Sequence, residues 1–446
     1  MKKFPSFTIC LLSLILAVSF TCGCDDAGGG EGLETYTITY HPNSADSGEA
    51  PDPVSVLEGD VFNVSGNTGN LVKAGYVLTG WNIEQNGSGE SYVLNTTAAS
   101  PDSDTVLYAK WVPVDPYFTF EIDGTAKVKA YTGTATDVVI PSSFDGISVT
   151  EICDEAFKEN SSIKVLTIPD SVTRIGDSAF NMCGFLTGVT IPDSVTSIGA
   201  EAFYYCISLT SVDIGNSVTS IGDRAFYSCS GLTDVTIPDN VTGIGNYAFY
   251  LCSGLESVYI GNGVISIGNS AFGWCESLTG VYIGNSVTSI GDSAFDVCRG
   301  LTQITIPDSV TSIGAEAFSY CESLEGITIP DSVTSIGDNA FSSCVSLAGV
   351  IIGNSVTSIG DNAFRDCSAL AQVTIPDSVT SIGDWAFFFC SVLADVYVNA
   401  AVPPETVVSI FDSCSLLTNI YVPSGSVEVY QGTTGWSACS DKISGQ

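Results

Sequence analysis

A period of 23 residues is the feature that most limits what this chain can fold into. The dipeptide Ala-Phe recurs at this interval over much of the sequence, and a last phenylalanine arrives one residue late. The repeated residues are Phe157, Phe180, Phe203, Phe226, Phe249, Phe272, Phe295, Phe318, Phe341, Phe364, Phe387 and finally Phe411. A unit of this length cannot bury its own apolar side chains, so successive units have to stack on one another. The sequence therefore predicts a solenoid.

The unit at residues 186–206 shows what each coil is expected to contain. Residues 189–191 alternate apolar, polar and apolar, which predicts a short strand that Pro192 ends because proline lacks a backbone donor. Residues 195–198 form a second inward-facing segment, and Gly199 is expected to permit the bend that follows. Residues 202–206 carry apolar side chains at helical spacing. We expect a mainly β solenoid of about twelve coils, each with short strands plus a short helical turn.

The repeated pattern Leu-x-x-Val-x-Ile-Pro-x-x-Val-x-x-Ile-Gly-x-x-Ala-Phe-x-x-Cys resembles the BspA-type leucine-rich repeat family. The resemblance covers residues 117–446. It implies an N-terminal cap with an imperfect first coil at 114–152, repeats at 153–418 and a C-terminal cap at 419–446. An uncovered terminal coil would expose apolar core and a strand edge, so caps are also required physically. Relatives of this type imply attachment to host matrix proteins and to other bacteria.

Residues 36–113 precede the repeats and alternate in the manner of a small β domain. Strands are predicted at 36–40 and 106–111, with a turn and an aromatic strand between them at 73–81. The string Gly-Tyr-x-Leu-x-Gly-Trp and the terminal Leu-Tyr-Ala-Lys-Trp resemble the Listeria–Bacteroides repeat, a β-grasp-like module. We expect Trp81 and Trp111 to belong to the core of this domain, because aromatic side chains readily fill small cores.

The first 24 residues have the pattern of a signal peptide. Two lysines are followed by an apolar run from 7 to 20 and then by Cys22 and Cys24. A cysteine after a small residue at this point resembles the lipobox of bacterial lipoproteins. Cys24 is the first candidate for lipidation and Cys22 the alternative. Residues 25–35 are Gly-rich and acidic, as expected of a flexible linker. Export with a lipid anchor at the bacterial cell surface or outer membrane is predicted, and secretion is the alternative.

The charge balance excludes one class of partner. Asp and Glu number 49 against 13 Lys and Arg, for a formal net charge of −36. Binding to a nucleic-acid backbone needs basic residues that neutralise phosphates, and no basic cluster follows the leader. We therefore expect no nucleic-acid partner. The acidity is expected to keep an apolar-rich repeat protein soluble.

Cysteines stand once per coil from Cys183 to Cys390, and Cys414 follows one residue late. Zinc sites require pairs within a coil or a histidine partner, and the single histidine, His41, lies outside the repeats. In-register side chains point in parallel, which opposes disulfides between neighbouring coils. We expect buried thiols and no metal site. The Asp and Asn residues at the turn after each strand, such as Asp193 and Asn216, leave a calcium ladder as a minor alternative.

Positions that vary while the frame repeats are the candidates for ligand binding. On the exposed strand position, where most coils have Thr, these residues are Asp213, Tyr259, Tyr282, Ile351 and Tyr397. A second set precedes the cysteine and comprises Tyr204, Tyr205, Tyr227, Tyr250, Trp274, Tyr320, Phe388 and Phe389. Aromatic side chains in a solvent-facing row supply contact area at low entropic cost, whereas packing against the adjacent coil is the alternative for both sets.

No catalytic residue is predicted. The repeats lack histidine, and no Gly-rich phosphate loop or metal-ligand cluster is present in the sequence. We expect no enzyme activity and no cofactor. The sequence favours an exported, surface-anchored, monomeric binding protein, adhesin-like, whose solenoid binds host proteins, other cells or glycans. The alternative is a structural envelope protein whose repeats mediate self-assembly.

Overall fold

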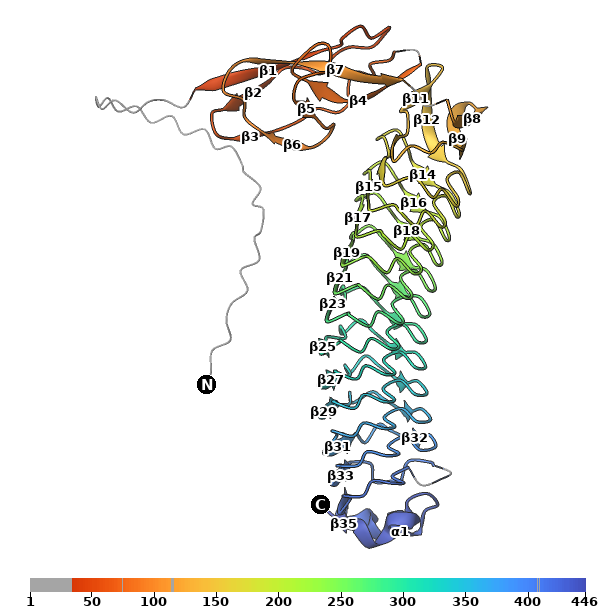
Figure 1. Ribbon diagram of the computed structural model, residues 1–446. Coiled ribbons are helices and arrows are strands. Elements are labelled where there is room, and N and C mark those ends of the chain that lie inside the picture. Colours follow the sequence, from red (N-terminus) through yellow and green to blue (C-terminus); the bar gives the residue numbers. More distant parts are fainter. Residues whose placement is uncertain (1–33, 74, 114–115, 407, 409) are drawn as a thin grey trace, which may run out of the picture.

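The computed structural model describes residues 34–446 except 74, 114–115, 407 and 409. The predicted signal peptide and the lipidation candidates Cys24 and Cys22 lie outside these residues. A small β domain stands at the N-terminal end of a long column of stacked coils (Figure 1). Within the described part of the chain, no helix has the length and apolar character needed to cross a membrane.

The small β domain contains a five-stranded sheet with the order β2-β1-β7-β4-β5 and a separate antiparallel pair, β3 with β6. Its strands are β1 (Thr35–His41), β2 (Val54–Leu57), β3 (Val61–Asn63), β4 (Tyr76–Asn82), β5 (Ser91–Tyr92), β6 (Thr97–Ala99) and β7 (Thr105–Pro113). β1 and β7 pair in parallel, and the other neighbours in the sheet are antiparallel. The three strands predicted for this domain correspond to β1, β4 and β7.

Both tryptophans of this domain belong to its core, as predicted. Trp81 is fully buried, with its ring centroid 4.7 Å from that of Tyr40 and its indole N–H donating to the carbonyl of Ser65 at 2.7 Å. Trp111 packs half-buried against the same core and donates to the carbonyl of Pro42 at 3.2 Å. Because each indole N–H is satisfied by backbone, neither ring is arranged as an open ligand platform.

The solenoid begins with a hairpin and an irregular first coil. These elements are β8 (Phe118–Asp123), β9 (Thr125–Tyr131), β10 (Asp137–Val139), β11 (Ser143–Phe144) and β12 (Ile147–Ile152). β9 pairs in parallel with β12, so the hairpin covers the N-terminal edge of one of the two solenoid sheets. The side-chain amide of Asn95 in the small domain donates a hydrogen bond to the carboxylate of Asp170 in the solenoid.

Each coil then contributes one strand to a first sheet and one to a second. The first sheet continues with β13 (Val165–Thr167), β15 (Gly188–Ile191), β17 (Ser211–Ile214), β19 (Asp234–Ile237), β21 (Ser257–Ile260), β23 (Gly280–Tyr282), β25 (Gln303–Ile304), β27 (Gly326–Thr328), β29 (Gly349–Ile351), β31 (Gln372–Ile375), β33 (Asp395–Val398), β34 (Asn419–Val422) and β35 (Ile443–Gly445). The second sheet continues with β14 (Arg174–Ile175), β16 (Ser197–Ile198), β18 (Ser220–Ile221), β20 (Gly243–Ile244), β22 (Ser266–Ile267), β24 (Ser289–Ile290), β26 (Ser312–Ile313), β28 (Ser335–Ile336), β30 (Ser358–Ile359) and β32 (Ser381–Ile382).

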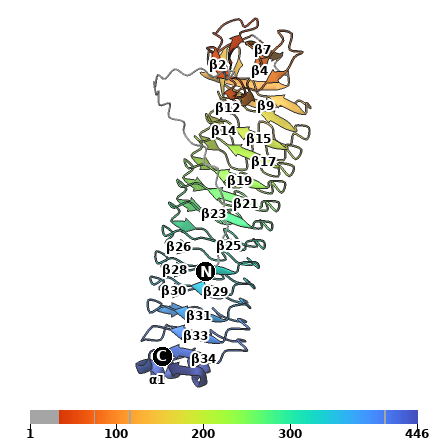
Figure 2. The ribbon, with the colours of Figure 1, turned by 90° about the vertical axis from the view of Figure 1, so that its left-hand side faces the viewer.

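The strands pair in parallel, and each residue lies opposite the equivalent residue of the next coil. Val189 lies opposite Val212, and Ile198 lies opposite Ile221. The second sheet is continuous from β8 to β32, whereas the hydrogen-bonded ladder of the first is interrupted after β25 and after β29. Figure 2 shows the strands of the first sheet lying one below another across the long axis. The mainly β solenoid is confirmed, with about fourteen turns because β10 and β35 extend the predicted twelve at the two ends.

The third side of each coil differs from the predicted helical turn. In the coil of residues 199–206, Glu201 and Tyr205 have φ values of 56° and 57°, which a right-handed helix does not allow. The N–H of Tyr204 bonds to the carbonyl of Glu201 at 3.0 Å, but that of Phe203 bonds to Ala225 in the next coil at 2.7 Å. Bonds within the coil therefore alternate with bonds between coils. The result is a series of tight turns, and none of the described residues on this side of the coils is helical.

The interior is built from columns of identical side chains. The phenylalanine rings from Phe157 to Phe411 stack in one buried column, with centroids 5.1 Å apart for Phe203 and Phe226. The cysteines form a parallel column of buried free thiols, as predicted. The thiol of Cys206 donates to the carbonyl of Phe180 at 3.3 Å, and the same bond recurs in each coil up to Cys414. Burial raises the pKa of Cys252 to about 12, so this thiol stays protonated at neutral pH.

The glycine after each second-sheet strand is required by the close approach of two coils. A Cβ at Gly199 would lie 2.5 Å from the carbonyl carbon of Gly176 in the preceding coil. Its φ is not positive, so the predicted role in permitting a bend is not what the residue does. Any side chain at this position would push neighbouring coils apart.

The C-terminal end of the column is covered by short helices. These are η1 (Ser424–Ser426), α1 (Val427–Gly432) and η2 (Ser437–Lys442). Trp436 is buried with its ring 6.0 Å from that of Phe411, and its indole N–H donates to the carbonyl of Pro404 at 3.0 Å. The hydroxyl of Tyr430 donates to Ala400 at 2.7 Å. This segment closes the phenylalanine column against solvent.

Candidate binding surfaces of the solenoid

The strand face is the outward side of the first sheet, and one row of side chains runs along it. Its residues are Thr167, Thr190, Asp213, Thr236, Tyr259, Tyr282, Thr305, Thr328, Ile351, Thr374, Tyr397 and Tyr421. All five strand candidates lie in this row, on β17, β21, β23, β29 and β33. These five strand candidates are spread along the length of the solenoid, and only two of them lie on neighbouring strands.

Tyr259 and Tyr282 form that pair. Their rings are parallel within 3° and 4.7 Å apart, and they are 40% and 44% exposed. Gly280, two residues before Tyr282, leaves open space beside the rings, since no atom lies within 4 Å of where its Cβ would stand. Partial desolvation, together with the nearby carboxylate of Asp239, raises the pKa of Tyr259. The pair is thus a stacked aromatic projection on a row in which Thr is the commonest residue.

The remaining aromatic and aliphatic candidates of the strand face are separate from this pair. Tyr397 is half-buried and stacks on Tyr421 at 4.9 Å. Ile351 is 65% exposed and stands between Thr328 and Thr374. Tyr421 escaped the sequence reasoning because its coil is one residue longer than the others, although its spacing of 24 from Tyr397 was the available signal.

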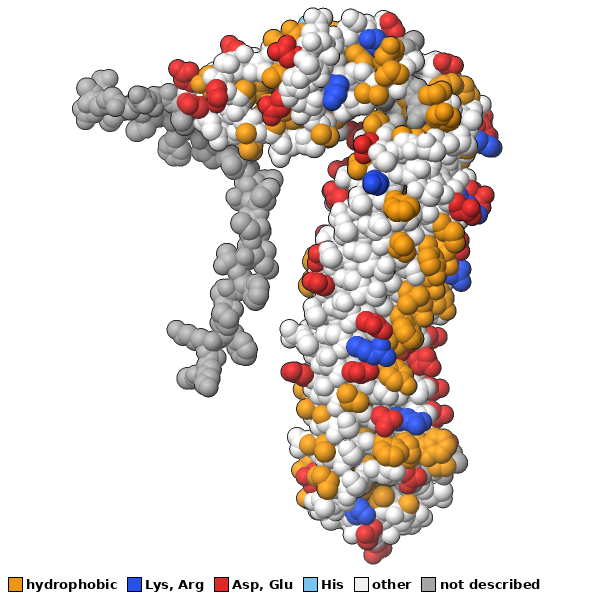
Figure 3. Space-filling view, in the orientation of Figure 1, with side chains coloured by type: hydrophobic (Ala, Val, Ile, Leu, Met, Phe, Trp, Pro, Cys, Tyr) orange, Lys and Arg blue, Asp and Glu red, His pale blue; other side chains and the backbone are white. Residues whose placement is uncertain are grey.

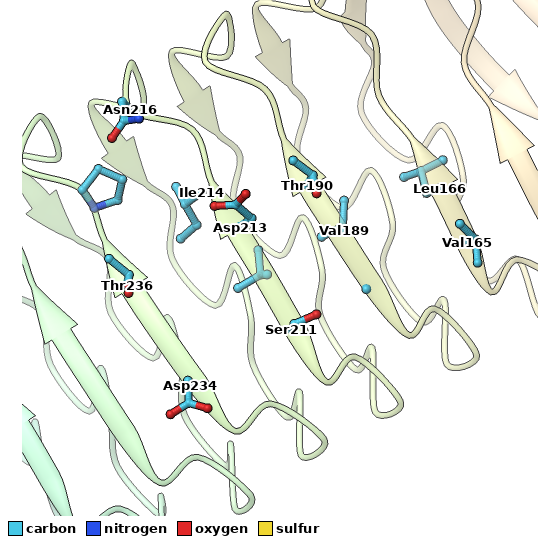
Figure 4. A pocket seen from close by; sticks show the side chains of 13 residues that line it. Val165, Leu166, Val189, Thr190, Ser211, Asp213, Ile214, Asn216, Asp234 and Thr236 are labelled. Atoms are coloured by element: carbon cyan, nitrogen blue, oxygen red, sulfur yellow. The ribbon is translucent and has the colours of Figure 1, made fainter. Parts of the chain in front are cut away.

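Asp213 lines a shallow hollow of about 570 Å³ between β15, β17 and β19 (Figure 4). Thr190, Asn216, Asp234 and Thr236 contribute to the same surface. β17 and β19 share a single register pair, whereas β15 and β17 share four, so the strands separate at the hollow. Its hydroxyl and carboxylate groups can hydrogen-bond a polar side chain of a partner.

The turn face is the side of the coils formed by the tight turns, and its largest feature is an aromatic cluster. We use this name for five residues whose rings contact one another, Tyr204, Tyr205, Tyr227, Tyr247 and Tyr250, together with Trp274 in the coil that follows Tyr250. No ring contact of Trp274 itself is found among the described residues. The rings of Tyr204 and Tyr227 are 4.9 Å apart, and those of Tyr227 and Tyr250 are 5.3 Å apart. Figure 3 shows a band of hydrophobic side chains along the column on the side away from the first sheet. The sequence set contained every member of this cluster except Tyr247, which varies at a different position of the turn.

The other turn candidates lie nearer the C-terminal end. Phe388 and Phe389 contact one another at 4.6 Å, and Trp385, which sequence reasoning missed, lies 6.5 Å from Phe388. The guanidinium of Arg365 lies 5.2 Å from the centroid of the Phe388 ring. Tyr320 is exposed between the two groups, and no ring contact involving it is found among the described residues.

The acidic turn residues have a structural use. Asp193 accepts a hydrogen bond from the backbone N–H of Asn216 in the next coil at 2.7 Å. A second ladder, which was not predicted, follows the glycine, where Asp177 accepts from the N–H of Ala200 at 2.9 Å. Each of these carboxylates therefore satisfies a backbone donor between coils. Across the described residues, no three His, Cys, Asp or Glu side chains are grouped so as to hold a metal ion.

The 23-residue coil, the parallel sheets and the exposed rows define a leucine-rich-repeat solenoid protein. The BspA type leucine rich repeat region family matches residues 150–279, 244–370 and 334–434, which together exceed half of the chain. The chain belongs to this family. The Listeria-Bacteroides repeat domain family matches residues 36–110, in the small β domain.

Individual relatives share parts of this architecture. A protein of Evansella cellulosilytica described as a Gly-rich membrane protein is 34% identical over 118 residues, which cover 26% of this chain and 13% of that protein. A leucine-rich cell surface protein of Faecalibacterium prausnitzii is 29% identical, with 72% of this chain and 97% of that chain covered and a TM-score of 0.46. A leucine-rich repeat protein of Bacteroides ovatus is 25% identical, with coverages of 75% and 99% and a TM-score of 0.46.

Repeats of the BspA type are typical of bacterial surface proteins, and leucine-rich-repeat proteins generally mediate protein interactions. The match to the Evansella protein spans about an eighth of that protein's length.

Proposed function

We propose that this chain is an exported, lipid-anchored, adhesin-like protein of the bacterial cell surface whose strand face binds another protein. The stacked and exposed pair Tyr259 and Tyr282 carries the proposal. Aromatic side chains held rigidly on a sheet offer a large contact area with little conformational entropy to lose. In this proposal residues 36–113 are a spacer, residues 419–446 a cap, and no catalytic step is involved.

The surroundings of the pair support a protein partner. Threonines precede and follow it in the same row, at Thr236 and Thr305, and provide the polar rim that protein interfaces use around an aromatic centre. The two rings cover one another at 4.7 Å, so each has one face left for a ligand. A glycan is the alternative ligand, because sugars also stack on aromatic faces.

The test uses the purified chain with Cys22 and Cys24 replaced by Ser, screened against arrays of host proteins, whole bacterial cells and glycans. For each bound partner, the dissociation constants of Tyr259→Ser/Tyr282→Ser and of the control Thr305→Ala are compared with that of the parent chain. Loss of two central aromatic residues is expected to weaken binding by about thirtyfold or more, corresponding to roughly 2 kcal/mol. Unchanged binding of every partner, with an unchanged circular dichroism spectrum, would exclude the strand pair.

The same preparation separates binding from self-assembly. We expect a sedimentation coefficient that does not depend on concentration, as for a monomer. An increase with concentration would instead support the structural envelope protein. In that case the interface between copies would be sought first on the two faces described above.

The anchor is tested in cells by labelling with radioactive palmitate. Label is expected in the parent chain and its loss in Cys24→Ser. Retention of label in that variant, with loss in Cys22→Ser, would move the anchor to Cys22. The absence of label from the parent chain would favour secretion.

A further inference from the structure

The aromatic cluster of the turn face occupies a backbone conformation that does not suit it. Tyr205, Tyr247 and Trp274 have φ values of 57°, 58° and 59°. L residues with bulky side chains are strained in this left-handed region, and glycine or asparagine would avoid the strain. Other coils show that the fold does not need an aromatic residue here, because Ser228 and Ser343 occupy the position of Tyr205 and Trp274. Backbone stability therefore gives no reason for these rings.

Packing against the core gives no reason either. Tyr205 and Trp274 are 40% and 38% exposed, while the buried column of phenylalanines lies inside them. Tyr204, Tyr227 and Tyr250 stack on one another with ring planes 21° and 27° apart. Because their faces cover each other, a planar sugar or base cannot enter between them. Ring edges, hydroxyl groups and the rings at the two ends of the cluster remain for a partner.

One arginine of the chain itself shows what this surface accepts. The guanidinium of Arg224 lies 5.4 Å from the centroid of the Tyr247 ring, and it stands 3.7 Å from the carboxylate of Glu201. A planar cation thus rests on an aromatic ring while pairing with a carboxylate, which is the arrangement that favours arginine over lysine.

The other end of the cluster offers similar groups without a cation of its own over the ring. Among the described residues, no Lys or Arg is found above the ring of Trp274. The neighbouring coil places the backbone of Asp296 next to that of Trp274, since the N–H of Trp274 bonds to the carbonyl of Asp296 at 2.7 Å. The carboxylate of Asp296 lies near Tyr250, whose pKa is raised by desolvation first and then by the charges of Tyr227 and Asp296. Desolvation first, and the charge of Glu316 second, raise the pKa of Asp296 to about 6. An added positive charge nearby would stabilise the ionised form of this carboxylate.

We propose that the aromatic cluster of the turn face binds an arginine-rich segment of another protein. The partner's guanidinium groups would lie on Trp274 and Tyr205 and along the tyrosine hydroxyls, while carboxylates of adjacent coils pair with them. The formal net charge of −36 attracts a basic chain over a distance, and the aromatic rings select arginine on contact. This surface is separate from the strand face, so the inference does not depend on the function proposed above.

The test measures fluorescence anisotropy of labelled peptides added to the full chain, with Cys22 and Cys24 replaced by Ser. One peptide alternates Arg and Gly, a second alternates Lys and Gly, and a third carries neutral citrulline in place of Arg. The Arg peptide is expected to bind about tenfold more tightly than the Lys peptide, and the citrulline peptide far more weakly.

The decisive variant is Tyr205→Asn/Trp274→Asn. Asparagine tolerates a positive φ, so the variant is expected to fold at least as stably as the parent while it binds the Arg peptide about tenfold more weakly. Tyr320→Asn is the matched control, because Tyr320 has a φ of 53° and is 47% exposed but lies outside the cluster. It should leave binding unchanged, as should Tyr259→Ser/Tyr282→Ser on the strand face.

Two results would overturn the proposal. Equal affinity for the Arg and Lys peptides, unchanged in the cluster variant, would assign binding to the acidic surface as a whole. An equal loss in Tyr320→Asn would show that the cluster is not the site. Circular dichroism and the unfolding temperature of each variant establish that the change is local.

Discussion

The strand face and the turn face display aromatic residues on the same repeating frame but under different backbone conditions. On the strand face Tyr259 and Tyr282 lie in extended strands, where tyrosine is among the favoured residues. On the turn face Tyr205 and Trp274 have positive φ values, where they are strained. A tyrosine on the strand face is thus partly explained by the stability of the sheet. An aromatic residue on the turn face is not explained by its backbone conformation, which leaves its contacts with neighbouring rings, such as that of Tyr205 with Tyr204 at 4.7 Å, and with the partner that we propose.

Both faces are held in place by the same buried core, so a substitution in that core should affect both. Phe249 is fully buried between Phe226 and Phe272, with ring centroids 5.1 and 5.2 Å away. Phe249→Ala should lower the free energy of unfolding by about 4 kcal/mol, because it removes a large buried ring and leaves a cavity. Urea unfolding measures this change, and binding at both faces near this coil should weaken together. Thr305→Ala, on the strand face, should change stability by less than about 0.5 kcal/mol.

The glycines on the two sides of a coil should respond differently to the same substitution. A Cβ at Gly245 would lie 2.6 Å from the backbone of Gly222, so Gly245→Ala is expected to lower the free energy of unfolding by about 3 kcal/mol. Gly280, on the strand face, has no atom within 4 Å of its Cβ position. Gly280→Ala should be neutral or slightly stabilising, since alanine loses less backbone entropy. Similar losses in both variants would contradict the assigned coil contact.

A carboxylate of the turn face should make stability depend on pH. The pKa of Asp296 is about 6 in the folded chain against 3.8 for the free group, because of desolvation and the charge of Glu316. The carboxyl group of Asp296 therefore binds its proton more tightly in the folded chain than in the unfolded chain. The stability that this protonation contributes is present below about pH 4 and is lost as the pH rises to about 6. Asp296→Asn should raise the free energy of unfolding by about 1.5 kcal/mol at neutral pH, a value reduced to allow for partial exposure.

Below the pKa of the free group, Asp296→Asn and the parent chain should unfold at nearly the same urea concentration. The neighbouring Arg299 lowers the pKa of Asp296 but does not offset the two raising effects. A gain that is equally large at acidic and neutral pH would show that the charge of Asp296 is not its cause.

The difference in backbone conformation between the two faces should also be measurable, although its effect on stability is small. Ser343 has a φ of 60°, so Ser343→Gly should raise the free energy of unfolding by about 1 kcal/mol. Ser211, in β17 on the strand face, is extended, and Ser211→Gly should lower it by about 0.5 kcal/mol because glycine loses more entropy in a strand. Thermal unfolding of the two variants should move in opposite directions. The same sign for both would remove the distinction between the faces.

The repeating part of the fold could be predicted from the sequence, because its residue types are determined by contacts within and between coils. The alternation of Val189 and Ile191 around Thr190 indicated a strand, and the period of the phenylalanines indicated a buried column. The tight turns could not be distinguished from a helical turn. Apolar residues spaced as Ala202 and Cys206 are would face inward in either conformation, and only the hydrogen bonds to the next coil decide between them.

The candidate surfaces were predictable in position but not in arrangement. The exposed location of Tyr259 followed from its strand, yet the stacking on Tyr282 depends on a spacing between coils that a sequence does not state. Tyr247 and Trp385 were missed because they occupy the first left-handed position of the turn, which the repeat pattern does not distinguish from its neighbours. Which face binds a partner remains a prediction, because the repeat pattern reflects contacts between coils and not contacts with another molecule.

The even spacing of the phenylalanine column also determines the length of the solenoid. Neighbouring rings are 5.1 Å apart at Phe203 and Phe226 and 5.3 Å apart at Phe341 and Phe364. Removing one 23-residue unit would join two coils that present the same phenylalanine, glycine and cysteine partners as before. The distance from the small β domain to the C-terminal cap can therefore change in steps of about 5 Å while every interior contact is preserved.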